Sequence, residues 1–226
     1  MEKKNGSSDE VLFSNFLGCL NDAEKKLVEQ NATFIELDKH EAIYKEGADS
    51  DRIYFVKRGR VKIVTNGEDD KEVLKSLVLE GELLGEGAIF GEKQRSDTAV
   101  AMDEGVTLLE MRGSVARELL RTNPELSFKV TGQIAQKLRS AEKRLEALTF
   151  KNSRTRIIEF LKDTAHRQGR KIGFETLLHP FLTHQDIGNL TTTSRQTVSS
   201  VLNELKGDNK IYYDRHRLLI RDLSVL

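Results

Sequence analysis

The 226-residue sequence predicts an α+β protein with a β-rich N-terminal part, one long helix and a small helical C-terminal domain. Three patterns support this class. Short β-prone runs separated by glycines extend from about Thr33 to Met111, apolar residues step by fours and threes after Pro124, and two closely spaced helix starts follow Leu182. Evenly spaced short strands are typical of a sandwich or barrel, whereas steps of three and four residues are typical of an amphipathic helix.

The N-terminal part begins with a polar leader, residues 1–20, and continues with a short helix over 21–30, for which Asn21 and Asp22 are capping candidates. Strands are expected at Ile53–Val56, Arg60–Val64 and Glu72–Leu79. Asn66-Gly67 predicts a hairpin turn, because both residues tolerate a positive φ. We therefore expect residues 21–122 to form one β domain.

A narrow apolar stripe follows Asn123. Asn123 is a candidate N-cap, and Pro124 suits the first position of a helix. The stripe consists of Leu126, Val130, Ile134, Leu138, Ala141, Leu145 and Leu148. Its narrowness and its charged flanks are typical of a coiled-coil seam, so we expect residues 123–150 to form a dimerisation helix. The alternative is a helix that packs on the β domain through the same stripe.

Residues 151–226 are expected to form a separate domain. A helix is predicted over Ser153–Gln168, and a β-prone piece over Lys171–Leu178 follows it. Two helix starts come next, because Thr183 with Asp186 and Thr193 with Gln196 have the spacing of a capping box. They predict two short helices joined by a tight turn, the second of them closed by Gly207 in the C′ position.

The second of these helices has an apolar face and a polar face. The polar face comprises Arg195, Gln196, Ser199, Ser200 and Asn203. In the major groove of DNA, arginine reads guanine, glutamine and asparagine read adenine, and serine binds bases or phosphates, so this face predicts DNA binding. The final hairpin places Arg215 and Arg217 toward backbone phosphates. The alternative is the ordinary polar surface of a small helical domain.

Charge and cysteine content narrow the function classes. The chain has 36 basic and 36 acidic residues, but the part from Lys151 onward has 13 basic and 8 acidic residues. A basic C-terminal third suits a polyanionic partner. The single cysteine, Cys19, excludes an internal disulfide, an iron–sulfur cluster held by this chain's thiolates and a multi-cysteine zinc site.

We expect no enzyme. The sequence has no GxSxG elbow, no P-loop and no HExxH motif, and Cys19 has no evident histidine and carboxylate partners. The N-terminus lacks the apolar core of a signal peptide, and no run approaches the roughly 18 apolar residues of a membrane helix. A cytoplasmic protein without a membrane partner is therefore expected.

The motifs together resemble those of the CRP/FNR family of transcription regulators over about Asn21 to Leu219. SRQTV at Ser194–Val198 is close to the family's SRETV. The resemblance implies a double-stranded β-helix (jelly-roll) sensor domain, a long dimerisation helix and a winged helix-turn-helix. It also implies a homodimer that binds double-stranded DNA, with RNA polymerase as a further candidate partner.

Within the helix-turn-helix, the resemblance implies that Arg195 contacts guanine, that Gln196 helps to read bases, and that Thr197 and Gln185 lie near phosphates. Ser200 aligns with a further base-contacting position of the cyclic-AMP-responsive members. Gln196 and Ser200 both depart from those members and argue against an identical operator. Thr192 stands where the turn usually has glycine. The predicted DNA-contacting set is Gln185, Ser194, Arg195, Gln196, Thr197, Ser199, Ser200 and Arg215.

The stretch GEGAIFGEKQRS resembles the phosphate-binding cassette of cyclic-nucleotide domains. In that cassette the glutamate, here Glu86, accepts the ribose 2′-hydroxyl, and the arginine and serine, here Arg95 and Ser96, hold the cyclic phosphate. Backbone N–H groups around Gly85 and Gly87 are candidates for an anion-binding nest. Cyclic AMP and cyclic GMP are therefore the candidate effectors.

Two departures from the cyclic-AMP members affect the ligand. Asp97 places a negative charge beside the intended phosphate. The hydroxyl pair that contacts adenine in those members aligns with Ala141-Glu142, so these contacts are missing, and Glu142 either meets a guanine edge or faces solvent. The alternative is a vestigial pocket in which Glu86 and Arg95 form an internal ion pair, in a regulator that needs no ligand.

Another class of function stays open, namely a cyclic-nucleotide-binding module that regulates a protein partner. Such a module would not need the exposed polar face of the helix that begins near Arg195. A haem sensor is disfavoured, because His40 is the only histidine in the β domain.

Overall fold

The computed structural model describes residues 17–66 and 72–226. Residues 1–16 of the expected leader and Gly67 of the expected hairpin turn lie outside the described residues. The chain forms two compact units, Met1–Leu138 and Arg139–Leu226, which divide inside the long helix α5 (Pro124–Phe150). The domain limits expected from the sequence stay a prediction. In the part of the chain that is described, no helix is both long and apolar enough to cross a membrane.

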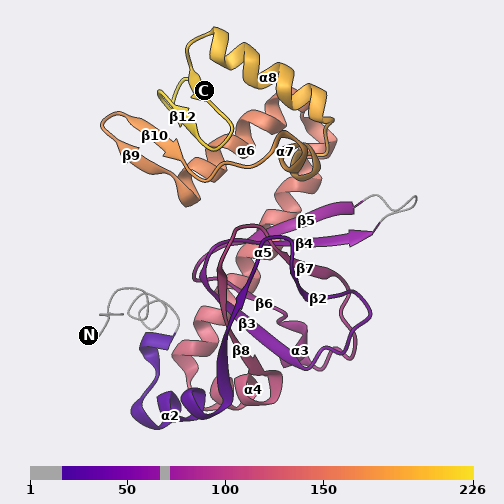
Figure 1. Ribbon diagram of the computed structural model, residues 1–226, viewed down its shortest axis with the longest axis vertical. Coiled ribbons are helices and arrows are strands. Elements are labelled where there is room, and N and C mark those ends of the chain that lie inside the picture. The colour runs from indigo at the N-terminus through magenta and orange to yellow at the C-terminus, as the bar shows by residue number, and fades with distance from the viewer. Residues whose placement is uncertain (1–16, 67–71) are drawn as a thin grey trace. The chain divides into compact units, whose positions relative to one another are not determined.

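The first unit is a sandwich of two four-stranded antiparallel sheets (Figure 1). One sheet has the order β1-β8-β3-β6 and the other the order β2-β7-β4-β5. The strands are β1 (Ala32–Leu37), β2 (Ala42–Tyr44), β3 (Arg52–Arg58), β4 (Val61–Asn66), β5 (Glu72–Val78), β6 (Leu83–Leu84), β7 (Thr98–Ala101) and β8 (Val106–Arg112). This arrangement confirms the predicted α+β class with an N-terminal jelly-roll domain. Three of the strands, β3, β4 and β5, were expected from the sequence.

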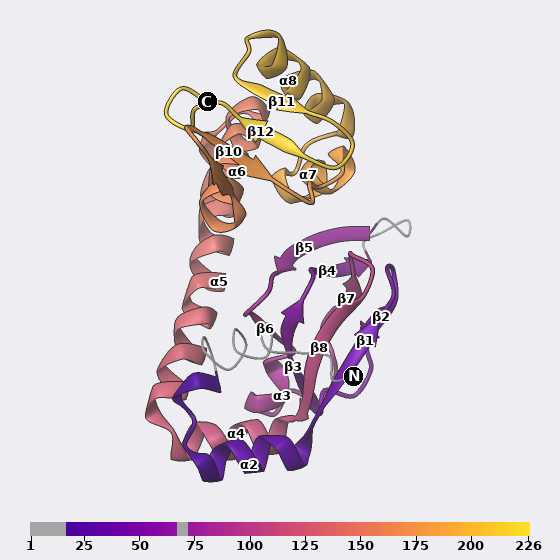
Figure 2. The ribbon, with the colours of Figure 1, turned by 60° about the vertical axis from the view of Figure 1, so that its left-hand side comes forward.

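Two helices close one end of the sandwich. They are α2 (Asp22–Asn31) and α4 (Gly113–Thr122), which lie side by side in both views (Figures 1 and 2). A capping box starts α2: the Asn21 side chain accepts hydrogen bonds from the backbone N–H groups of Ala23 and Glu24, and Glu24 accepts one from the Asn21 N–H. The predicted cap at Asn123 is confirmed as well, since its Oδ1 accepts a hydrogen bond from the Leu126 N–H at 2.9 Å.

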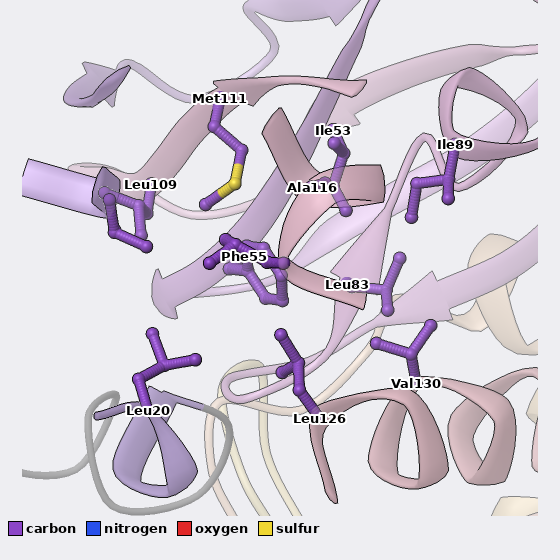
Figure 3. Close-up of a cluster of buried hydrophobic side chains, with 12 residues drawn as sticks. Leu20, Ile53, Phe55, Leu83, Ile89, Leu109, Met111, Ala116, Leu126 and Val130 are labelled. Atoms are coloured by element: carbon purple, nitrogen blue, oxygen red, sulfur yellow. The ribbon is translucent and has the colours of Figure 1, made fainter. Parts of the chain in front are cut away.

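A buried apolar cluster joins the helices to the β3-containing sheet (Figure 3). Phe55 lies at its centre, between Met111 on one side and Leu126 and Val130 of α5 on the other. Burial of each such side chain contributes about 1.5–3 kcal/mol of transfer free energy. The first two turns of α5 are therefore part of the core of the first unit.

This packing corrects the predicted seam. Leu126 and Val130 are 4% and 3% exposed, so they belong to the core and cannot belong to a dimer seam. Ile134 is half-buried against the same cluster. Farther along α5, Leu138 and Leu145 are 60% and 67% exposed, so only this part of the stripe is available to a partner. The sequence pattern is continuous, but the β domain covers only its first half.

The second unit combines three helices with a four-stranded sheet of order β11-β12-β10-β9 (Figure 1). Its elements after α5 are α6 (Ser153–Gln168), β9 (Arg170–Ile172), β10 (Glu175–Leu178), α7 (His184–Thr191), α8 (Arg195–Gly207), β11 (Ile211–Tyr213) and β12 (Leu218–Ile220). The helix expected over Ser153–Gln168 is confirmed residue for residue. Ile157, Leu161, Ile187, Leu202 and Leu205 are fully buried and form the centre of this unit.

The end of α8 differs from the prediction. Gly207 is the last helical residue, and the left-handed position falls on Asn209, whose φ is 56°. The Lys210 N–H then donates to the Leu205 carbonyl at 2.9 Å and closes the helix end. Asparagine reaches this conformation more easily than most residues, so a glycine is not required there.

Candidate functional site

A pocket of about 500 Å³ in the first unit brings the predicted cassette residues together. Its lining consists of Tyr44, Ile63, Ser76, Leu84, Gly85, Glu86, Gly87, Phe90, Glu92, Arg95, Ser96, Asp97 and Lys137. Five of the six predicted ligand residues are among them. The sixth, Glu142, is not in the lining and is exposed on α5, so its role stays a prediction.

Arg95 is the buried cation of this pocket, with 4% of its surface exposed. Nη1 donates to the Gly85 carbonyl at 3.2 Å, Nη2 donates to the Arg52 carbonyl, and the guanidinium lies 4.3 Å from the centre of the Tyr44 ring. Among the described residues, no carboxylate pairs with Arg95 and its Nε has no hydrogen-bond partner. An uncompensated buried charge is unfavourable, so this site favours an anion.

The missing side chain of Gly85 leaves room for the Arg95 guanidinium. Its φ is +77°, and a β-carbon there would lie 2.7 Å from Nη1 of Arg95. A larger residue would therefore be strained and would displace the guanidinium.

The alternative of an internal ion pair between Glu86 and Arg95 does not hold in the structure. Glu86 instead pairs with Lys137 of α5, with 2.7 Å between Oε1 and Nζ. The same ammonium donates to the Leu83 carbonyl at 2.8 Å. One turn earlier, Gln133 accepts a hydrogen bond from the Leu83 N–H at 3.1 Å and donates to the Gly81 carbonyl at 2.9 Å. Helix α5 is thus tied to β6 and to the cassette glutamate.

Lys137, like Tyr44 and Glu92, lines the pocket but is not among the ligand residues predicted from the sequence. It lies one turn after Gln133, so both side chains leave the same side of α5. No local pattern distinguishes it from the other charged residues of this helix, because its role depends on strand β6, which is far away in the sequence.

The charge of Asp97 is balanced within the first unit. Its carboxylate accepts a hydrogen bond from the Tyr44 hydroxyl at 3.3 Å and lies 3.5 Å from Nζ of Lys75. Burial, and then the nearby Asp97 carboxylate, raise the pKa of Tyr44 far above its usual range, so Tyr44 keeps its proton and remains a donor. Asp97 therefore opposes a bound phosphate less than its sequence position suggests.

In the second unit, the predicted cap of α7 is confirmed and the predicted cap of α8 is off by one residue. Thr183 and Asp186 form a reciprocal capping box. At α8 the N-cap is Ser194, whose Oγ accepts a hydrogen bond from the Thr197 N–H at 3.0 Å. The Thr193 hydroxyl lies instead 3.0 Å from the Thr191 hydroxyl, inside the turn.

The polar face of α8 lies outward. Arg195, Gln196 and Ser200 are exposed, Thr197 and Ser199 are half-buried, and Val198, Val201, Leu202 and Leu205 are buried. The last four side chains anchor the helix on the unit's core. The exposed side chains are accessible to base edges in a DNA groove.

Other predicted DNA-contacting residues flank this face. Gln185 is exposed on α7, where its amide donates to Oδ1 of Asn189 at 3.0 Å. Arg215 is exposed in the turn between β11 and β12. Arg217, expected to face phosphate, instead pairs with Asp214 at 2.7 Å within that turn.

The turn between α7 and α8 contains a left-handed threonine. Thr192 has φ 51° and ψ 53°, a conformation that is unfavourable for a β-branched residue by about 1–2 kcal/mol. Arg156 of α6 stabilises the turn: its Nε donates to the Thr191 carbonyl at 2.9 Å and its Nη2 to the Thr192 carbonyl at 3.0 Å. The turn thus forms without the usual glycine because tertiary contacts hold it.

Replacing Thr192 by glycine should raise the free energy of unfolding by about 1 kcal/mol, because it removes this backbone strain. Urea unfolding followed by circular dichroism measures the change. Thr193→Gly is the matched control and should lower stability, since Thr193 has no positive φ. A lower stability of Thr192→Gly would show that the Thr192 side chain contributes more than its strain costs.

Comparison with known protein families gives two matches. Residues 34–123 match the cyclic nucleotide-binding domain family, and residues 155–226 match the Crp-like helix-turn-helix domain family. The first range contains almost all of the pocket lining, and the second contains α7, α8 and the final hairpin.

Individual relatives and solved structures agree with this pattern. The chain is 26% identical over 171 residues to the cAMP-activated global transcriptional regulator CRP of Haemophilus influenzae, a match that covers 74% of each chain. It is 27% identical to a CRP-like cAMP-activated global transcriptional regulator of Mycobacterium tuberculosis, over 83% of this chain and 84% of that protein. The structure is similar to FixK2 from Bradyrhizobium japonicum (20% identity, TM-score 0.74, 86% and 94% covered) and to a CooA mutant from Carboxydothermus hydrogenoformans (23%, 0.74, 99% and 95%).

Proposed function

The chain belongs to the CRP/FNR family of DNA-binding transcription regulators, and we propose that a small anionic ligand in its β domain controls the affinity of a homodimer for DNA. A regulator of this kind acts on the chromosome, so double-stranded DNA and RNA polymerase are its proposed partners and the cytoplasm its proposed location. The family consists of transcription regulators, and we propose that this chain likewise acts as a regulator without catalytic activity.

The ligand proposal depends on the burial of Arg95 and on its lack of a carboxylate partner among the described residues. A guanidinium that is 4% exposed, with an unpartnered Nε and no carboxylate beside it in the described chain, favours an anion in the pocket. Arginine binds phosphate oxygens with fixed N–H donors, so a phosphate ester is the best-matched anion. A vestigial pocket would be expected to have an internal counter-charge at this position.

Cyclic AMP and cyclic GMP are the proposed effectors. The two relatives described above are named as cAMP-activated, and the lining contains the residues that the resemblance assigns to the cyclic phosphate and the ribose. Gly85, Arg95 and Ser96 would surround the cyclic phosphate. Glu86 would accept the ribose hydroxyl, with the Gly87 N–H beside it.

A bound ligand would directly affect the contact between Glu86 and Lys137 of α5. A ribose hydroxyl on Glu86 would change the contact between Glu86 and Lys137, which now ties α5 to the cassette. A ligand shifts a conformational equilibrium only by its difference in affinity for the two states. Lys137 is therefore the residue through which a bound nucleotide would favour one placement of α5.

On the DNA side, we propose that α8 reads bases in the major groove. Arg195, Gln196, Ser199 and Ser200 are the base-reading candidates, while Gln185, Ser194, Thr197 and Arg215 are the candidates for phosphate contacts. Two copies of α8 in a dimer would bind half-sites about one helical turn, or roughly 34 Å, apart.

Calorimetric titration with cyclic AMP and with cyclic GMP tests the ligand proposal. We expect saturable binding of at least one nucleotide, weakened by at least about 30-fold in Arg95→Ala, because a buried charge contact is lost. Lys93→Ala is the control, since Lys93 is an exposed cation of the same loop outside the pocket lining. No binding of either nucleotide, or equal binding by Arg95→Ala, would overturn the cyclic-nucleotide assignment.

A further inference from the structure

One carboxylate of the pocket lining, Glu92, forms no ion pair among the described residues. Glu86 pairs with Lys137 at 2.7 Å, and Asp97 lies 3.5 Å from Lys75. Glu92 has no cation partner among the described residues, and its Oε2 only accepts a hydrogen bond from the Ser50 hydroxyl at 3.4 Å. The lining thus combines an unpaired buried cation, Arg95, with an unpaired carboxylate that does not reach it.

The backbone after α3 places Glu92 beside Gly87. After the single turn α3 (Gly87–Phe90), Gly91 adopts φ +87°, and the Glu92 N–H donates to the Gly87 carbonyl at 3.0 Å. A β-carbon at position 87 would lie 1.8 Å from Oε2 of Glu92 and 2.7 Å from its Cδ. The carboxylate of Glu92, an exposed residue, therefore lies against the backbone of Gly87.

The lining alone has a formal charge of −1, from Glu86, Glu92 and Asp97 against Arg95 and Lys137. Lys75, outside the lining, pairs with Asp97, so Glu92 remains as a negative charge that no cation pairs with among the described residues. A pocket of about 500 Å³ is roughly 10 Å across, and the Debye length is about 8 Å at physiological ionic strength but about 30 Å at 0.01 M salt, so Glu92 acts most strongly on a bound anion at low salt. The repulsion grows in proportion to the charge of that anion.

We propose that Glu92 is a charge filter that makes the pocket select a singly charged phosphodiester over a doubly charged phosphomonoester. The proposal rests on the proposed function of the pocket as a nucleotide site. It adds a specificity residue that would not touch the phosphate, since Arg95 attracts both kinds of ligand and Glu92 penalises the dianion more. Such a filter would favour cyclic nucleoside monophosphates over linear ones by about threefold, the ratio of the two repulsions.

The test compares Glu92→Gln with the unchanged protein. Cyclic AMP, with one negative charge, and 5′-AMP, with two at pH 8, are titrated calorimetrically at low salt, with competition against cyclic AMP for the weaker ligand. Glu92→Gln keeps the size of the side chain and removes its charge. The affinity should rise roughly threefold for cyclic AMP and roughly tenfold for 5′-AMP, because the repulsion doubles with the ligand charge.

The controls separate this proposal from the one on which it rests. Lys93→Gln removes an exposed charge of the same loop outside the lining and should leave the ratio of the two affinities unchanged. Raising the salt concentration should reduce both gains in Glu92→Gln. Equal affinities in Glu92→Gln and the unchanged protein, or equal gains for both ligands, would overturn the filter and leave the nucleotide site intact. If neither protein binds either nucleotide, cyclic GMP and 5′-GMP are titrated in the same way, and no binding of any of the four would show that the nucleotide site itself is wrong.

Discussion

Replacing Leu138 and Leu145 by aspartate should leave the protein monomeric and weaken its binding to a two-half-site operator by about 10²- to 10⁴-fold, the usual gain from bivalent attachment. The two leucines are 60% and 67% exposed, and their spacing of seven residues places them on one side of α5. A dimer seam would bury them. Aspartate at these positions would place unpaired charges in that seam, which is strongly unfavourable.

Sedimentation velocity measures the oligomeric state, and fluorescence anisotropy measures binding to an operator selected from random sequences. The matched control is Gln136→Asp with Lys143→Asp, which has the same spacing on the other side of the helix, at exposed positions. It should remain a dimer. Because neither leucine is part of the core of its unit, the thermal unfolding of the monomer should still be cooperative. A stable dimer of Leu138→Asp with Leu145→Asp would show that subunits associate elsewhere.

Arg195→Ala should lower the affinity for the selected operator by about 1–3 kcal/mol and relax the base preference at one base pair of each half-site. Arg195 is the first residue of α8, is exposed, and has no ion-pair partner among the described residues. Its guanidinium is therefore available for a bidentate contact with guanine. The affinity for unrelated DNA should fall much less, because that affinity depends on the sum of phosphate contacts.

The measurement is anisotropy with the selected operator, with single-base variants of it and with unrelated DNA, at one fixed salt concentration. Arg170→Ala is the control, since it removes an exposed arginine of β9 that is outside the predicted contact set. An equal loss on operator and unrelated DNA would reduce Arg195 to a phosphate contact. Unchanged DNA binding together with unchanged regulation would favour the other class of function, a module that acts on a protein partner.

Several local elements could be predicted from the sequence alone. The helix cap at Asn21, the capping box at Thr183 and the helix Ser153–Gln168 follow from residues that are close in the sequence, whereas α4 was not predicted. The polar and apolar faces of α8 follow from its periodicity in the same way. Short-range hydrogen bonds and helix geometry decide these features, so a linear pattern contains the information. The α+β class followed because these local elements come in blocks.

Which parts of the apolar stripe of α5 are covered depends on the tertiary structure. One continuous stripe on α5 became core at Leu126 and Val130 and open surface at Leu138 and Leu145, because the β domain ends between them. A periodic pattern defines an apolar face but not the length of its partner.

The set of residues that lines the pocket also depends on the tertiary structure. Tyr44, Glu86, Arg95 and Lys137 come from distant parts of the chain, and their pairing depends on which charges the strands and α5 bring within reach. From the sequence, an internal pair of Glu86 with Arg95 stayed open as an alternative, whereas the fold pairs Glu86 with Lys137 and leaves Arg95 without a carboxylate partner among the described residues. Ion pairs form between neighbours in space, so sequence proximity alone could not choose between these two partners.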